Sequence, residues 1–244
     1  MNTKNGSTYY LFDVDGTLTP PKRGMTTHML FHFLQWSTNK SIFIVAGSDK
    51  KALDSQLPSS IISRCEGVFS SMANELHIDK KKVYSNEWNP STNLINYLES
   101  LYEKSEYPES PVGAVIEERP GMLNFCIPGR NSNSDSRLNY YMWDAEHRQR
   151  TFFMENIENE FPELETRLGG QTSIDIQPRG NNKSQASKWI RDNKKGAKIF
   201  FFGDKCFKNG NDYDIMLDIE NHGDGKVFKV NDYTDTLKLL TENL

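Results

Sequence analysis

Apolar and polar positions follow one another in blocks that predict short buried strands separated by amphipathic helices. Apolar runs at 9–14, 42–46, 67–69 and 198–202 are typical of buried strands. Between the first two, residues 29, 30, 33 and 34 are apolar and keep the three-and-four spacing of one helix face. This alternation predicts an α/β core of three layers with a parallel sheet.

The middle of the chain, from about 86 to 183, has a different pattern. Helical patterns at 94–101 and 152–161 are mixed with strand-like pieces, which lie at 113–117, 122–127 and 173–177. Polar loops separate these pieces, so an inserted α+β domain is expected rather than further α/β layers. We therefore predict a Rossmann-like core made of 1–81 and 184–244, interrupted by an α+β domain at 82–183.

Composition and charge exclude several classes of protein. The net charge of −4 leaves no basic footprint for nucleic acid. The longest apolar runs are too short to span a membrane, and Met1–Ser7 has no secretory signal pattern, so we expect a cytoplasmic protein. The three cysteines are odd in number and widely spaced, which argues against a disulfide framework and a thiolate zinc cluster; they are Cys65, Cys126 and Cys206.

Two aspartates, Asp13 and Asp15, come directly at the end of the first predicted strand, which Gly16 terminates. The carboxyl edge of an open α/β sheet is where ligands bind. Side chains two apart on a strand project in the same direction, so two carboxylates, or one carboxylate and a backbone carbonyl, can hold one hard cation. A calcium loop is the alternative, but its twelfth position would be Gly24 instead of a glutamate.

Further candidate site residues lie at other strand ends. Asp204 follows the strand at 198–202, and Asp212 comes after a Gly/Asn-rich turn, so both can join the first pair of carboxylates as metal ligands. Ser48 could hold a phosphate oxygen or only cap a helix, and Lys183 could supply a compact positive charge or lie in solvent. Their occurrence in this order favours a metal-dependent phosphate site.

Longer motifs extend over nearly the whole chain. They are LFDVDGTLTPP, VAGSDKK, RPGMLNFCIPGR, LGGQTSIDIQP and FFGDK…GNDYDI. Together they resemble the eukaryotic-type phosphomannomutases of the haloacid dehalogenase (HAD) superfamily. The resemblance implies a HAD core with a cap, and an enzyme that interconverts mannose 6-phosphate and mannose 1-phosphate and feeds GDP-mannose synthesis. It also implies an aspartyl-phosphate intermediate, a hexose 1,6-bisphosphate intermediate, and hexose 1,6-bisphosphate as the activator.

The resemblance implies a role for each candidate residue. Asp13 would be the nucleophile, Asp15 the general acid and base, and Ser48 and Lys183 further catalytic residues. Magnesium would be held by Asp13, Asp15 through its carbonyl, Asp204 and Asp212. The substrate, a small sugar phosphate, would be bound by Lys22, Arg119, Arg130, Arg137, Ser173 and Asp175.

The family also implies a homodimer formed through the cap. Trp88, the segment 94–101 and the segment 140–143 carry enough apolar side chains to form part of such a surface, or to close the core of the cap itself.

The chain departs from the family pattern at three places. PRGNNK (178–183) stands where PDGWDK is usual, Lys22 stands where the family has an arginine, and FSSMANELHI (69–78) replaces the FPENG pattern. Two other functions therefore stay open within the superfamily, a sugar phosphatase and a phosphohexomutase with mainly phosphoglucomutase activity. A non-catalytic binding protein is a third, but it would not need both Asp13 and Asp15.

Overall fold

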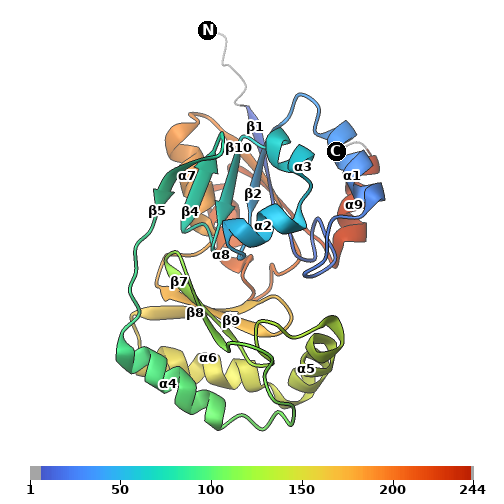
Figure 1. Cartoon of the computed structure of the whole chain (residues 1–244). Coiled ribbons are helices and arrows are strands. Elements are labelled where there is room, and N and C mark those ends of the chain that lie inside the picture. The colour runs from blue at the N-terminus through green and yellow to red at the C-terminus, as the bar shows by residue number, and fades with distance from the viewer. Residues whose placement is uncertain (1–6, 243–244) are drawn as a thin grey trace. The chain divides into compact units, whose positions relative to one another are not determined.

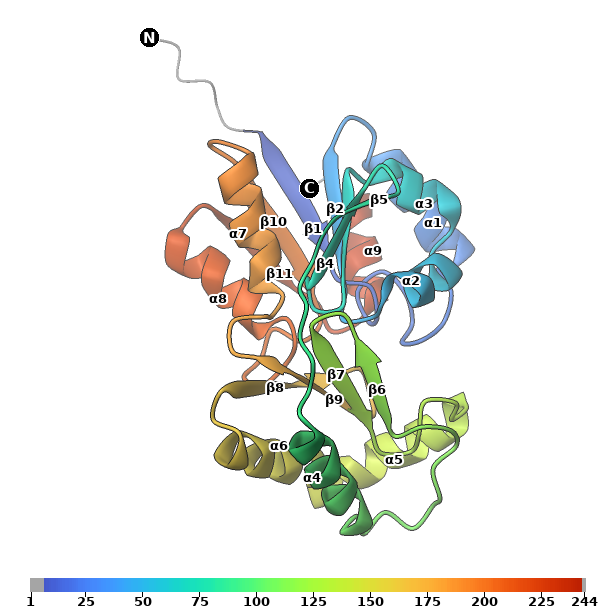
Figure 2. The same cartoon turned by 60° about the vertical axis from the view of Figure 1, so that its left-hand side comes forward.

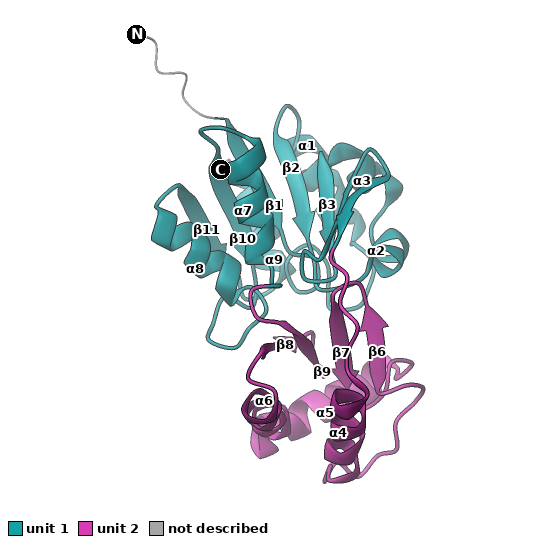
Figure 3. Ribbon diagram, turned by 90° about the vertical axis from the view of Figure 1, so that its left-hand side faces the viewer, with its two compact units in different colours: residues 1–85, 181–244 teal, residues 86–180 magenta. Residues whose placement is uncertain are grey.

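The computed structural model describes residues 7–242, which divide into two compact units (Figure 3). Unit 1 comprises residues 1–85 and 181–244, and unit 2 comprises 86–180. The expectation of no secretory signal concerns residues 1–7, of which 1–6 lie outside the described part. None of the described helices is long and apolar enough to cross a membrane.

Unit 1 is built on a seven-stranded sheet with the order β11-β10-β1-β2-β3-β4-β5. The strands are β1 (Thr8–Phe12), β2 (Ser41–Val45), β3 (Gly67–Ser70), β4 (Glu75–Ile78), β5 (Lys81–Ser85), β10 (Lys198–Gly203) and β11 (Gly225–Lys229). The strands from β11 to β3 in this order pair in parallel, as the sequence predicts. The antiparallel additions β4 and β5 were not predicted.

Helices cover both faces of this sheet (Figures 1 and 2). They are α1 (Thr27–Trp36), α2 (Lys50–Gln56), α3 (Ser59–Arg64), α7 (Ser184–Asn193), α8 (Tyr213–His222) and α9 (Tyr233–Thr241). One apolar cluster joins the sheet to α1, α2, α3 and α9, and a second joins it to α7 and α8. Phe12 belongs to the first cluster and Leu11 to the second, because successive strand residues face opposite sides. The three-layered α/β core is therefore confirmed.

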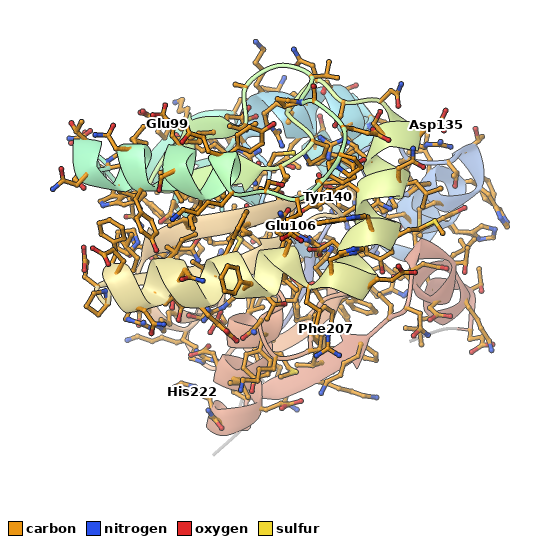
Figure 4. All side chains as sticks on the ribbon, turned by 90° about the horizontal axis from the view of Figure 1, so that it is seen from below. Glu99, Glu106, Asp135, Tyr140, Phe207 and His222 are labelled. Atoms are coloured by element: carbon orange, nitrogen blue, oxygen red, sulfur yellow. The ribbon has the colours of Figure 1, made fainter. Side chains whose placement is uncertain are left out.

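Unit 2 is an α+β unit. Its sheet has the order β6-β7-β9-β8, with all neighbours antiparallel. The strands are β6 (Ile116–Arg119), β7 (Met122–Cys126), β8 (Leu164–Gly169) and β9 (Ser173–Pro178), and the helices are α4 (Thr92–Glu103), α5 (Ser134–His147) and α6 (Gln149–Glu160). Leu123, Phe125, Ile174 and Ile176 of the sheet pack on all three helices. Figure 4 looks onto these helices and labels Tyr140, which is fully buried.

The structure differs from the sequence expectation at the boundaries between the units. The boundaries between the units fall after 85 and after 180, whereas the sequence placed them after 81 and after 183. Residues 81–85 belong to unit 1 because they form β5, which pairs with β4. Leu94, Leu98, Leu101 and Tyr140 form part of the core of unit 2, which is one of the two roles that the sequence left open for them.

Candidate active site

The first aspartate of the site is held at the end of β1. The backbone N–H of Asp13 donates to the carbonyl of Phe202 on the neighbouring β10 (3.0 Å), so the strand keeps its register up to the aspartate. Gly16 then turns the chain with a φ of +87°. A Cβ atom at Gly16 would lie 2.4 Å from Asp204 Oδ2, so the glycine also allows the close approach of that carboxylate.

Three carboxylates converge at the carboxyl edge of the sheet of unit 1. Asp13, Asp204 and Asp212 each offer an oxygen, and these oxygens lie within 4.8 Å of one another. They follow β1, follow β10 and precede α8, respectively. The Oδ1 atom of Asp204 is buried and has no hydrogen-bond partner among the described residues. A buried acceptor without a donor, beside two further carboxylates, fits a hard divalent cation such as Mg²⁺.

A buried lysine neutralises part of this negative charge. Lys183 Nζ lies 2.5 Å from Asp13 Oδ1 and 2.7 Å from Asp212 Oδ1, and its side chain is fully buried. Burial alone would lower the pKa of Lys183, but its two carboxylate partners raise it above the usual value. Burial, together with the negative charges of Asp212 and Asp204, raises the pKa of Asp13 to about 8 against the opposing effect of Lys183. Lys205 Nζ lies 3.3 Å from Asp204 Oδ2, so three carboxylates face two ammonium groups, which favours a further cation.

Asp15 has partners of its own. Its carboxylate accepts hydrogen bonds from Lys22 N (2.7 Å) and Gln56 Nε2 (2.7 Å), and Lys22 Nζ lies 2.9 Å from Oδ2. Burial would raise the pKa of Asp15, but the charge and hydrogen bonds of Lys22 and Gln56 outweigh burial and lower it. Asp15 is therefore ionised. Its carboxylate does not belong to the group of three, so only its backbone carbonyl stays a predicted metal ligand.

Ser48 is joined to the same lysine. Lys22 Nζ donates to Ser48 Oγ at 2.8 Å, so a predicted substrate-binding residue and a predicted phosphate ligand are neighbours. Ser48 is not the helix cap that the sequence also allowed, because Asp49 caps α2 by accepting from the N–H of Ala52.

Two of the three predicted arginines of unit 2 form an ion-pair group. Glu117 Oε2 lies 2.5 Å from Arg119 Nη2 and 3.1 Å from Arg130 Nε. Arg130 Nη1 also donates to Asn124 Oδ1 at 3.0 Å. One carboxylate thus holds two guanidinium groups together.

The remaining predicted residues lie near this group in unit 2. Asn124 Nδ2 donates to Asp175 Oδ1 (2.7 Å), which links Asp175 to Arg130. Arg137, on α5, donates to Thr172 Oγ1 (2.7 Å) and to the carbonyl of Arg130 (3.5 Å). Ser173 lies two positions before Asp175 on β9 and therefore shares its face of the sheet.

Three of these partners were missed by sequence reasoning. Gln56, Glu117 and Asn124 each bind a predicted site residue, and Gln56 and Asn124 lie far in the sequence or on other elements from the residues they bind. Of the three, only Glu117 could have been found from the sequence, because it lies two positions before Arg119 on one strand and therefore shares its face.

The cysteines take no part in the site. All three are free thiols. Burial raises the pKa of the Cys206 thiol above its ordinary value, which disfavours the nucleophilic thiolate.

The aspartate at the end of β1, the buried lysine and the further carboxylates lie on one sheet edge, the arrangement that the sequence predicts for a phosphotransferase of the HAD type. The fold agrees, since a HAD subclass IIB sugar phosphatase superimposes with a TM-score of 0.56 over 97% of this chain and 98% of its own, at 14% identity. Residues 30–244 match the model of the eukaryotic phosphomannomutase family, and the chain belongs to that family. It is 32% identical to a phosphomannomutase of Triticum aestivum, over 87% of both chains. It is also 32% identical to that of Saccharomyces cerevisiae, over 96% of this chain and 93% of that protein.

Proposed function

We propose that this protein interconverts mannose 6-phosphate and mannose 1-phosphate, which would feed GDP-mannose synthesis in the cytoplasm. The observation that carries the proposal is that the two aspartates have separate sets of partners. Asp13 is bound to Lys183 in the carboxylate cluster, whereas Asp15 is held ionised by Lys22 and Gln56 outside it. A nucleophile and a separate proton carrier are what a mutase needs.

The cycle begins with phosphorylated Asp13, formed from hexose 1,6-bisphosphate. The ionised Asp15 removes the proton from a free hydroxyl of the bound sugar phosphate, and the resulting alkoxide attacks phosphorus. The bond between phosphorus and the Asp13 oxygen breaks, which gives the hexose bisphosphate and a protonated Asp15. After the sugar has turned end for end, Asp13 attacks the other phosphate, and Asp15 returns its proton to the leaving sugar oxygen. At the end of one cycle, Asp15 has lost the proton that it took up, and Asp13 carries a phosphoryl group again.

Two features support the handling of anionic phosphate. Asp13, Asp204, Asp212 and the carbonyl of Asp15 would hold Mg²⁺, which would reduce the repulsion between the anionic nucleophile and the phosphate. Guanidinium groups suit the phosphate that is not reacting. We assign this role to the arginines of unit 2 and sugar-hydroxyl contacts to Ser173 and Asp175.

A direct product assay tests the proposal. Mannose 1-phosphate is incubated with Mg²⁺ and a trace of hexose 1,6-bisphosphate, and glucose 1-phosphate is assayed in parallel. We expect mannose 6-phosphate, with a lag when the bisphosphate is omitted. Release of inorganic phosphate without isomerisation would replace the mutase by the sugar phosphatase, and faster turnover of the glucose epimer would replace it by a phosphoglucomutase.

We also propose a homodimer formed through unit 2. Leu138, Tyr141 and Met142 are exposed and keep the three-and-four spacing of one face of α5. Such an apolar stripe fits an isologous contact. Light scattering should give twice the chain mass of 28.1 kDa at micromolar protein, and a monomer mass would contradict the dimer.

A further inference from the structure

The segment between β3 and β4 contains a turn of unusual backbone conformation. Ser71, Met72 and Ala73 have φ angles of 50°, 58° and 64°, three left-handed residues in succession, and none of them is glycine. L-residues disfavour this region because Cβ approaches the following carbonyl oxygen. The turn belongs to FSSMANELHI, the segment that departs from the family pattern, and all three residues are buried. A conformation of this kind persists only where its surroundings hold it.

One side of the turn is bonded to the chain that follows β2. The N–H of Ser71 donates to the carbonyl of Ser48 (2.9 Å), and the N–H of Met72 donates to the carbonyl of Ala46 (3.0 Å). The left-handed residues therefore direct two consecutive N–H groups at the loop that carries Ser48.

The other side of the turn is bonded to the chain around Lys183. The side chain of Asn74 is fully buried, and its Nδ2 donates to the carbonyls of Ser71 (2.8 Å) and Asn181 (3.3 Å). Its Oδ1 accepts from Nε2 of Gln185 at 3.2 Å. Asn74 thus holds a residue on each side of Lys183.

We infer that Asn74 is a positioning residue for Lys183 in the proposed phosphoryl transfer. Lys183 directly precedes α7, and its side chain makes no capping hydrogen bond to that helix. Its long side chain must nevertheless deliver Nζ to both Asp13 and Asp212. The bonds from Asn74 to Asn181 and Gln185 fix the backbone from which this side chain starts. An ångström of displacement at a reacting group can lower a rate by about a hundredfold.

A purely structural role for Asn74 is the rival interpretation, in which it only satisfies the carbonyl of Ser71. The chain contains a matched control for it. Tyr84 Oη, on β5, donates to the carbonyl of Ala73 at 2.8 Å, so it stabilises the same turn from a strand outside the Lys183 segment. Tyr84→Phe removes that hydroxyl alone.

The experiment measures kcat, KM and Tm with acetyl phosphate and Mg²⁺ for Asn74→Ala, Gln185→Ala, the double variant and Tyr84→Phe. We expect kcat to fall about tenfold in Asn74→Ala and less in Gln185→Ala, with KM changing by less than about twofold. The double variant should be no slower than Asn74→Ala, because both changes break one connection. Tyr84→Phe should lower Tm but keep kcat within about twofold of wild type.

Several results would overturn the inference. The first is a kcat of Asn74→Ala close to that of wild type. The second is a fall of kcat in Tyr84→Phe as large as in Asn74→Ala. The third is a double variant in which the two single falls of kcat multiply. Should Asn74→Ala fail to fold, the half-buried Gln185→Ala decides alone, and an unchanged kcat there refutes the inference. Although the inference rests on the proposed function, hydrolysis of acetyl phosphate needs no isomerisation. A wild-type protein that hydrolyses acetyl phosphate but never isomerises mannose 1-phosphate therefore refutes the mutase and leaves the test of Asn74 valid. A wild-type protein inactive on both substrates contradicts both.

Discussion

The charged groups of the two units are held in different ways. In unit 1, the side chains of Lys183 and Asp212 are fully buried and fixed by short contacts. In unit 2, Arg119 is buried, but Glu117, which binds it and Arg130, is 32% exposed. Buried charges cannot be rehydrated when a partner leaves, whereas exposed charges can. Unit 1 therefore suits a preorganised reaction centre, and unit 2 suits charges that exchange a carboxylate for a phosphate.

The largest effect is expected at the nucleophile of unit 1. Asp13→Asn is nearly isosteric and should lower turnover by about four orders of magnitude or more, because the amide cannot form the phosphoenzyme. Turnover and the circular dichroism spectrum should be measured together. An unchanged spectrum with near wild-type turnover would remove Asp13 from the nucleophile role.

The next largest effect is expected at the buried lysine of unit 1. Lys183→Met leaves Asp13 and Asp212 buried without their positive partner, so the free energy of unfolding without Mg²⁺ should fall by about 3–5 kcal/mol. Urea denaturation measures this. Lys188→Met, at an exposed position of α7, the helix that Lys183 precedes, should change stability by less than about 0.5 kcal/mol. Equal losses of stability in the two variants would show that the buried contacts of Lys183 contribute no more than an exposed lysine does.

The sequence predicts the site residues at strand ends better than it predicts their distant partners. Asp13 and Asp204 were placed correctly at one sheet edge because each follows an apolar run, and the ends of parallel strands meet at one edge. Asn74 and Gln56 carry no local signal, because their partners lie 107 and 41 positions away. The pattern also missed β4 and β5, since four or five residues of mixed polarity do not separate strand from loop.

The third prediction concerns the effect of the unit 2 arginines on catalytic turnover. Arg119→Ala and Arg137→Ala should each lower mutase turnover about ten- to a hundredfold, since one charge-assisted contact is worth roughly 1.5–3 kcal/mol. Acetyl phosphate has no second phosphate, so its hydrolysis should change much less. Arg179→Ala is the control, because Arg179 is an exposed arginine of the same unit outside the ion-pair group. A parallel loss of both activities would contradict the distal-phosphate role.

The smallest effect on stability is expected at Glu117, the counterpart in unit 2 of the carboxylates that hold Lys183. Glu117→Gln removes the charge of a partly exposed side chain but keeps an acceptor oxygen beside the buried Arg119, so the free energy of unfolding should fall by less than about 1 kcal/mol. The same change should strengthen the binding of inorganic phosphate, because Arg119 and Arg130 lose the carboxylate that competes with it. Urea denaturation and titration calorimetry measure the two effects. A loss of about 3 kcal/mol, or weaker phosphate binding, would show that Glu117 is as indispensable to its arginines as Asp13 and Asp212 are to Lys183, and the contrast between the two units would then fail.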